Sequence, residues 1–240
     1  MSPNMETPLN VVDTNVLFNW AGHLSGMRGG TWITDEVQRQ SFERKLTACA
    51  RFCEDDKQEI VIPIPMWAEL LGAFLHKAID VADYARYCQW YRIRRAVLDQ
   101  ILLAIECSGN IRWGDDGVDY RRAVHLTGLQ LPQVVVSHLR GPGSPPYAST
   151  SSLPPSGRPS TAQAGAKLLD GNDSVVLAEA WRIAEARASR EVCLVSDDRG
   201  LGIAVRHLRS GGWPGAQRPP RNLRFRRVWD LVNRYVPSVR

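Results

Sequence analysis

Several features that would identify other classes of protein are missing from this sequence. No apolar run reaches the roughly 18 to 20 residues that a membrane helix needs, and residues 1–9 do not pair a basic segment with an apolar one. The five cysteines form no Cys-x-x-Cys pair, and no histidine joins Cys49 and Cys53 at ligand spacing. We therefore expect a soluble, unexported, cytoplasmic protein with reduced core thiols, no membrane partner and no zinc site.

The chain alternates between β-branched apolar runs and amphipathic helical patterns, which is the rhythm of an α/β protein with a parallel sheet. Its 240 residues suffice for one well-buried core, so we expect a single domain over residues 1–240. We predict strands that end at Asp13 or cover residues 59–64, 134–138, 191–196 and 222–225. We predict helices over residues 14–24, 35–55, 65–78, 80–107, 119–129, 173–189, 201–208 and 228–235.

Residues 141–163 interrupt this rhythm with six prolines, many serines and threonines, and almost no aliphatic side chains. Such a composition cannot bury enough apolar surface to offset the entropy of ordering, so we expect an exposed loop. We interpret it as an insertion within the domain, because the candidate site residues lie on both sides of it.

Four acids lie near the start of a predicted helix or the end of a predicted strand: Asp13, Glu69, Asp173 and Asp198. The carboxyl edge of a parallel sheet is where α/β proteins place their sites, so these positions favour a shared site. Structural roles stay open for three of them. Asp13 and Asp173 can cap the helices that follow, and Glu69 can pair with an arginine. Asp170 competes with Asp173 for either role.

In their order along the chain, the four acids resemble the motif of the PIN-domain nucleases. That motif is an Asp after the first strand, a Glu in a helix, an Asp opening a later helix, and an Asp after Thr/Ser-x. The resemblance covers residues 9–107 and 165–226, and the chain is longer than the VapC-type toxins of that family. It implies an α/β fold with three layers, α/β/α, and a central parallel sheet. It selects Asp198 as the ligand after Ser196, with Asp197 as a further ligand or a solvated acid, and Gly200 stands where the family often has another acid.

The resemblance also implies a reaction. It makes the four acids catalytic and metal-binding. Thr14, Asn15 and Ser196 are the supporting residues, and Thr14 and Asn15 are expected to orient Asp13 or a metal-bound water. Oxygen-only ligands select Mg²⁺ or Mn²⁺. Such a cation activates a water and stabilises the leaving oxygen of a phosphodiester. We therefore expect a metal-dependent endoribonuclease that hydrolyses single-stranded or structured RNA. Toxin, RNA-processing and defence roles fit the same acids, and an antitoxin-like protein inhibitor and a homodimer are open as partners.

The last sixth of the chain is strongly basic. Residues 199–240 hold ten Arg and one acid, although the whole chain has a net charge of only +5. Aromatic residues are interleaved with these arginines, so the segment combines phosphate-neutralising charge with stacking faces. We predict that Arg224, Arg226 and Arg227 bind RNA. Two alternatives are that they protect an edge strand from pairing with other chains, or that they bind an acidic protein inhibitor.

Two other functions compete with the nuclease. Asp13-Thr14-Asn15 followed by a later Ser196-Asp197-Asp198 also resembles a haloacid-dehalogenase-type phosphatase. Phosphatases of that family have an acid two residues after the nucleophile, whereas Asn15 cannot transfer a proton. The other alternative is a catalytically inactive PIN-like module that binds RNA or a protein, which the presence of all four acids disfavours.

Overall fold

The protein is represented by a computed structural model that describes residues 7–26, 35–76, 84–114, 122–123, 126, 171–212 and 219–237. The predicted strand over 134–138, the insertion over 141–163 and Asp170 lie outside these residues. Of the predicted helix over 119–129, the structure describes Arg122, Ala123 and Leu126, which are helical and buried. None of the described helices is long and apolar enough to cross a membrane.

The described part of the chain is organised around a five-stranded sheet in which every pair of neighbouring strands is parallel. In spatial order the strands are β3, β2, β1, β4 and β5. Their bounds are Leu9–Val12 for β1, Glu59–Ile62 for β2, Ile111–Trp113 for β3, Val192–Ser196 for β4 and Leu223–Arg227 for β5. The α/β class and the central parallel sheet predicted from the sequence are confirmed.

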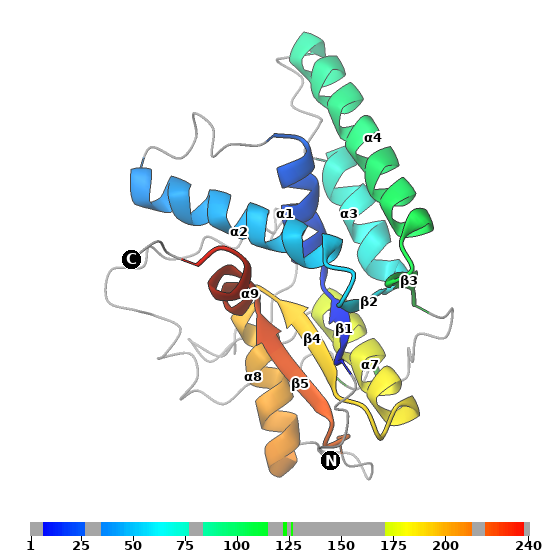
Figure 1. Cartoon of the computed structure of the whole chain (residues 1–240). Helices are drawn as coiled ribbons and strands as arrows, with labels where there is room; N and C mark the ends of the chain where they lie inside the picture. Colours follow the sequence, from blue (N-terminus) through cyan, green and yellow to red (C-terminus); the bar gives the residue numbers. More distant parts are fainter. Residues whose placement is uncertain are drawn as a thin grey trace, which may run out of the picture.

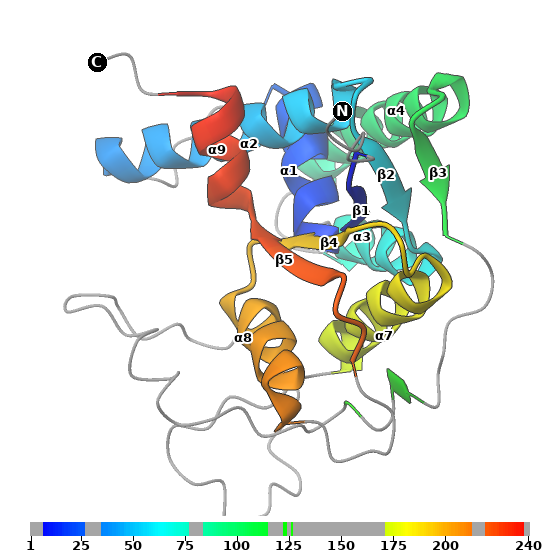
Figure 2. The same cartoon turned by 60° about the horizontal axis from the view of Figure 1, so that its bottom comes forward.

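Helices cover both faces of this sheet, as Figures 1 and 2 show, with α7 and α8 on one face and α1 and α2 on the other. β1 and β4 are therefore buried along their whole length, and their sequences are nearly continuous apolar runs. The helix bounds are Thr14–Leu24 for α1, Glu36–Glu54 for α2, Ile64–His76 for α3, Tyr84–Cys107 for α4, Gly171–Ala186 for α7, Arg199–His207 for α8 and Val228–Tyr235 for α9; a π-helical turn, η2, covers Leu208–Gly212. The three-layer α/β/α arrangement is confirmed.

The structure differs from the sequence prediction at several element boundaries. β3 was not predicted at all, and it pairs with β2 at one edge of the sheet. β2 ends at Ile62 because Pro63 follows it, and α3 begins at Ile64 rather than Pro65. α8 begins at Arg199 because Asp198 caps it, and β5 continues to Arg227 because it pairs with β4 along its whole length.

The cysteines largely behave as core thiols. Cys49, Cys53 and Cys193 are free and buried, and burial raises the pKa of the Cys49 thiol to about 12 and that of Cys193 to about 11. The expectation was wrong for Cys107, which is exposed at the end of α4.

The end of the chain is anchored on α2. The Tyr235 ring lies edge-on to Phe52, with 6.3 Å between ring centroids, and its hydroxyl donates to Asp55 over 2.6 Å. Arg51 donates to the Tyr235 carbonyl. These contacts fix α9, and with it the carboxyl end of β5, to the layer formed by α1 and α2.

Candidate active site

The four predicted acids meet at the carboxyl edge of the sheet. Asp13 directly follows β1, and Asp198 comes two residues after the end of β4. Glu69 lies in α3, and Asp173 lies in the first turn of α7. α3 packs against both α1 and α7, which brings their acids to the same edge. Together they line one pocket of about 310 Å³, and the remaining lining residues are Thr14, Asn15 and Phe18.

Asp13 is held in place by three hydrogen bonds. Its Oδ1 accepts from the Thr14 backbone N–H at 2.7 Å, and its Oδ2 accepts from Asn15 Nδ2 at 2.5 Å and from Ser196 Oγ at 2.6 Å. The side chain is only 8% exposed. Both carboxylate oxygens are thus fixed in direction before any ligand binds.

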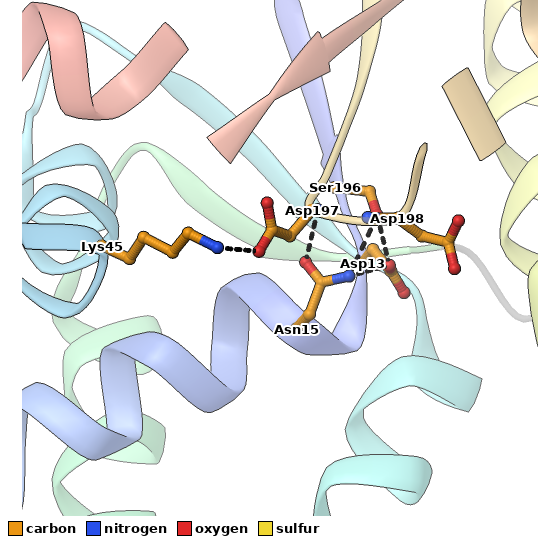
Figure 3. A network of polar contacts seen from close by, with 6 residues as sticks. All are labelled: Asp13, Asn15, Lys45, Ser196, Asp197 and Asp198. Atoms are coloured by element: carbon orange, nitrogen blue, oxygen red, sulfur yellow. Dashed lines mark hydrogen bonds and ion pairs between the residues drawn. The ribbon is translucent and has the colours of Figure 1, made fainter. Parts of the chain in front are cut away.

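Asn15 and Ser196 connect Asp13 to the loop after β4, as Figure 3 shows. Asn15 Oδ1 accepts from the Asp197 backbone N–H at 2.9 Å, and Ser196 Oγ accepts from the Asp198 backbone N–H at 2.9 Å. A second bond from Asn15 Nδ2 reaches Ser196 Oγ at 3.0 Å. The side chains that follow β1 and β4 therefore form one hydrogen-bonded unit, and both residues lie where the resemblance predicted orienting groups.

Thr14 contacts two of the four acids. Its hydroxyl donates to Glu69 Oε2 at 2.6 Å, so it orients Glu69, while only its backbone N–H reaches Asp13. Asp198 also has a structural contact, because its Oδ1 accepts from the Gly200 backbone N–H and caps α8. Its capping role and its place in the pocket therefore coexist.

The electrostatics of the pocket disfavour a full set of negative charges. Burial raises the pKa of the Asp13 carboxyl from 3.8 to about 6, hydrogen bonds from Ser196 and Thr14 oppose this rise, and the charges of Glu69 and Asp198 add to it. A bound cation would reverse the effect of burial and repulsion, since it favours ionised carboxylates. The all-oxygen donor set fits a hard divalent cation.

The acids do not form a ready-made metal-binding group in the described part of the chain. Within the described ranges, no three acid, histidine or cysteine side chains lie close enough together to hold a metal ion as they stand. Two of the acids are bonded elsewhere: Glu69 to Thr14 and Asp198 to Gly200. Binding a cation through several of these carboxylates would require their side chains to turn toward the centre of the pocket.

Asp197 does not line the pocket. Its Oδ2 lies 2.5 Å from Lys45 Nζ, and the Lys45 ammonium lies 5.3 Å from the centroid of the Trp229 ring. Figure 3 shows Lys45 reaching Asp197 from α2, on the side away from Asp198. In this arrangement Asp197 belongs to an ion pair rather than to the ligand set.

The sequence analysis missed two residues at this edge, Lys45 and Phe18. Lys45 lies 152 residues from Asp197, and nothing local distinguishes it from other polar residues of an amphipathic helix. Phe18 lines the pocket, and its position four residues after Thr14, on the same side of α1, was an available signal.

Arg224, Arg226 and Arg227, the predicted RNA-binding residues, lie on β5. β5 and β3 are the two outermost strands of the described sheet. Arg224 Nε lies 3.5 Å from Glu191 Oε2, and Arg226 Nη1 donates to Asn10 Oδ1 at 3.0 Å. The Arg227 backbone N–H donates to Asp230 at the start of α9. β5 is an edge strand of the sheet that the described residues form, as predicted, and contact of these three side chains with RNA stays a prediction.

Comparisons of the chain with protein-family models, with curated proteins and with solved structures find no match.

Proposed function

We propose that the protein is a metal-dependent endoribonuclease of PIN-like organisation. The observation that carries the proposal is the gathering of Asp13, Glu69, Asp173 and Asp198 around one pocket at the carboxyl edge of a parallel sheet. These acids come from four separate segments of the chain, so no single local structural need explains their convergence. The proposed substrate is single-stranded or structured RNA, and the proposed cofactor is Mg²⁺ or Mn²⁺.

The acids of the pocket would hold the cation, which would supply Lewis-acid activation of water and stabilisation of the leaving oxygen. Asn15 and Ser196 keep Asp13 in one orientation through two hydrogen bonds to the same oxygen. Thr14 does the same for Glu69. This organisation reduces the reorganisation needed when substrate and cation bind.

A haloacid-dehalogenase-like phosphatase fits the site less well. Such an enzyme needs Asp13 to attack phosphorus, but its Oδ2 accepts two hydrogen bonds and its Oδ1 accepts a third. The residue two positions on, Asn15, has both amide atoms engaged, by Asp13 and Ser196 on one side and by the Asp197 N–H on the other. An amide in this position cannot act as the general acid or base.

We also propose a toxin or defence role, a cytoplasmic location, an antitoxin-like inhibitor and a homodimer. The acid pocket supports the toxin and defence roles, because RNA hydrolysis is the activity that they share. The remaining alternative is a catalytically inactive module that binds RNA or a protein. The cleavage assay described next distinguishes this module from a nuclease.

The test is cleavage of labelled single-stranded RNA in Mg²⁺ or Mn²⁺ by purified wild type, Asp13→Asn and Asp198→Asn. Asp99→Asn is the matched control, because Asp99 is a 64% exposed acid on α4. We expect wild type and the control to cleave and both site variants to lose at least about a hundredfold in rate. EDTA should abolish cleavage. Equal rates for wild type and Asp13→Asn would refute the assignment, and no cleavage by any of them would favour the binding module.

A further inference from the structure

A second feature of the molecule lies on the β3 side of the sheet, beside α7. A pocket of about 100 Å³ is lined by Arg112 and Trp113 of β3, by Arg182 of α7 and by Arg187 just after it. We call this surface the basic groove. A larger hollow continues from it at the amino edge of the sheet, where Arg187 is joined by Lys57 and Arg190.

The basic groove is connected to the acid pocket by α7 and by a pair of tryptophans. α7 carries Asp173 in its first turn and Arg182 nine residues later, which corresponds to about 13 Å along the helix axis. The Trp113 ring lies edge-on to Trp67, with 5.5 Å between centroids, and Glu69 of the acid pocket follows Trp67 by two residues. Figure 2 shows α7 on one face of the sheet, toward the side on which β3 lies.

Two arginines of the groove, Arg182 and Arg112, are held in place by acids, but the positive charge of the surface is not cancelled. The buried Glu179 carboxylate binds Arg182 through two hydrogen bonds, at 2.7 and 2.9 Å. Glu59 is shared by Arg112 at 3.3 Å and Arg190 at 2.5 Å. The four arginines and Lys57 thus face these two acids and Asp56, which leaves an excess of positive charge. Guanidinium groups fixed in this way offer planar donor pairs to phosphate oxygens.

We propose that the basic groove binds the backbone of a single-stranded RNA whose scissile phosphate lies in the acid pocket. Trp113, which is partly exposed, would stack on an unpaired base beside these phosphates. The inference rests on the proposed function, since it extends the substrate path of the same site. It places this contact on the β3 edge, whereas the sequence had pointed to arginines on β5 that contact Asn10 and Glu191.

The binding test uses Asp13→Asn protein, so that the RNA is not cut, with Arg112→Gln and Arg187→Gln added together. Arg182 is left intact because its loss would leave the Glu179 carboxylate buried without this partner. The matched control adds Arg39→Gln and Arg209→Gln and so removes the same charge. Arg209 is exposed, Arg39 is half-buried and pairs with Glu36, and neither lines the groove. The probe is a labelled single-stranded RNA of about a dozen nucleotides, a length suited to one basic binding surface.

By fluorescence anisotropy, we expect the groove variant to bind at least about tenfold more weakly than the control. A plot of the logarithm of the binding constant against the logarithm of salt concentration should have a slope that is shallower by about 1.4. Each of the two lost phosphate contacts contributes about 0.7 to this slope on a single strand. Affinity and salt slope equal to those of the control would overturn the proposal, even if the RNA binds well.

Cleavage separates this proposal from the proposed function. In a protein with the wild-type Asp13, Arg112→Gln and Arg187→Gln together should raise KM for the single-stranded RNA used in the binding test, here called the long RNA, and leave its kcat nearly unchanged. A dinucleotide, which is too short to reach the groove, should be cleaved equally by wild type and by this variant. If wild type cleaves but KM for the long RNA does not change, the nuclease stands and the groove is wrong. If nothing cleaves but binding depends on the groove, the nuclease is wrong and the RNA surface stands.

Discussion

Replacing Asp13 with asparagine should stabilise the metal-free protein at alkaline pH. Burial, together with the charges of Glu69 and Asp198, raises the pKa of Asp13 from 3.8 to about 6. A carboxyl with a raised pKa binds more protons in the folded state, so stability falls as pH rises from about 4 through about 6 and then levels off. This rise in the pKa of Asp13 corresponds to about 3 kcal/mol of destabilisation of the folded protein at pH 8.

Asparagine removes this charge but also changes the hydrogen bonds. Because Asn15 and Ser196 both donate to Oδ2, the amide oxygen should take that position and the NH₂ group should face the Thr14 N–H. The lost bond costs about 1 kcal/mol. Asp13→Asn should therefore be more stable than wild type by about 2 kcal/mol at pH 8, which is about 4–8 °C in Tm for a chain of this size.

The assay is chemical unfolding in EDTA at pH 8 and at pH 4, with Asp99→Asn as a control whose stability should follow wild type. At pH 4 the advantage of Asp13→Asn should disappear. In a parallel series at pH 8 without EDTA, free Mn²⁺ at a hundred times its Kd should stabilise wild type by about 2.7 kcal/mol and the variant by less. A variant that is less stable than wild type by the same amount at both pH values would show that the Asp13 carboxylate is not under electrostatic strain.

Two further predictions concern contacts around the site. Lys45→Met should lower the free energy of unfolding by about 1 kcal/mol more in wild type than in an Asp197→Asn background. The reason is that both partners of this ion pair are mostly buried. Additive effects of the two substitutions in the double-mutant cycle would contradict the pairing. Tyr235→Phe should destabilise the protein by about 1 kcal/mol at pH 7, since the hydrogen bond from Tyr235 lowers the pKa of Asp55. A carboxyl whose pKa is lowered by folding stabilises the folded protein at pH values above its pKa in the unfolded chain, which is about 4. The loss in Tyr235→Phe should therefore shrink as the pH of unfolding titrations falls below about 4. A loss independent of pH would point to ring packing alone.

The central part of the fold was predictable because its signals are local. β1 and β4 are nearly continuous apolar runs that end directly before Asp13 and Asp197, and such runs are typical of buried parallel strands. The helices that follow them begin at good capping residues, Asp13 and Asp198. The resemblance to the PIN-domain motif selected the four acids, and the rule that sites lie at the carboxyl edge predicted that they would meet there.

What the sequence did not reveal depends on pairing across long separations. β3 has three residues, of which only Ile111 is buried, and its strand conformation follows from pairing with β2. Lys45 meets Asp197 only because α2 and the loop after β4 are brought together by the fold. The arginines of β5 looked alike in the sequence, but Arg226 bonds Asn10 of β1 across the intervening strand β4, which composition cannot indicate.

The central claim is that the acid pocket binds a divalent cation for RNA hydrolysis. Its most direct test is the anomalous scattering of crystals grown with Mn²⁺ at a concentration that supports cleavage. We predict a peak inside the pocket with an Asp13 oxygen at about 2.1 Å, together with at least one of Glu69, Asp173 and Asp198, and its absence in Asp13→Asn crystals. Mn²⁺ bound only outside the pocket, in a preparation that cleaves RNA, would contradict the assignment of the active site.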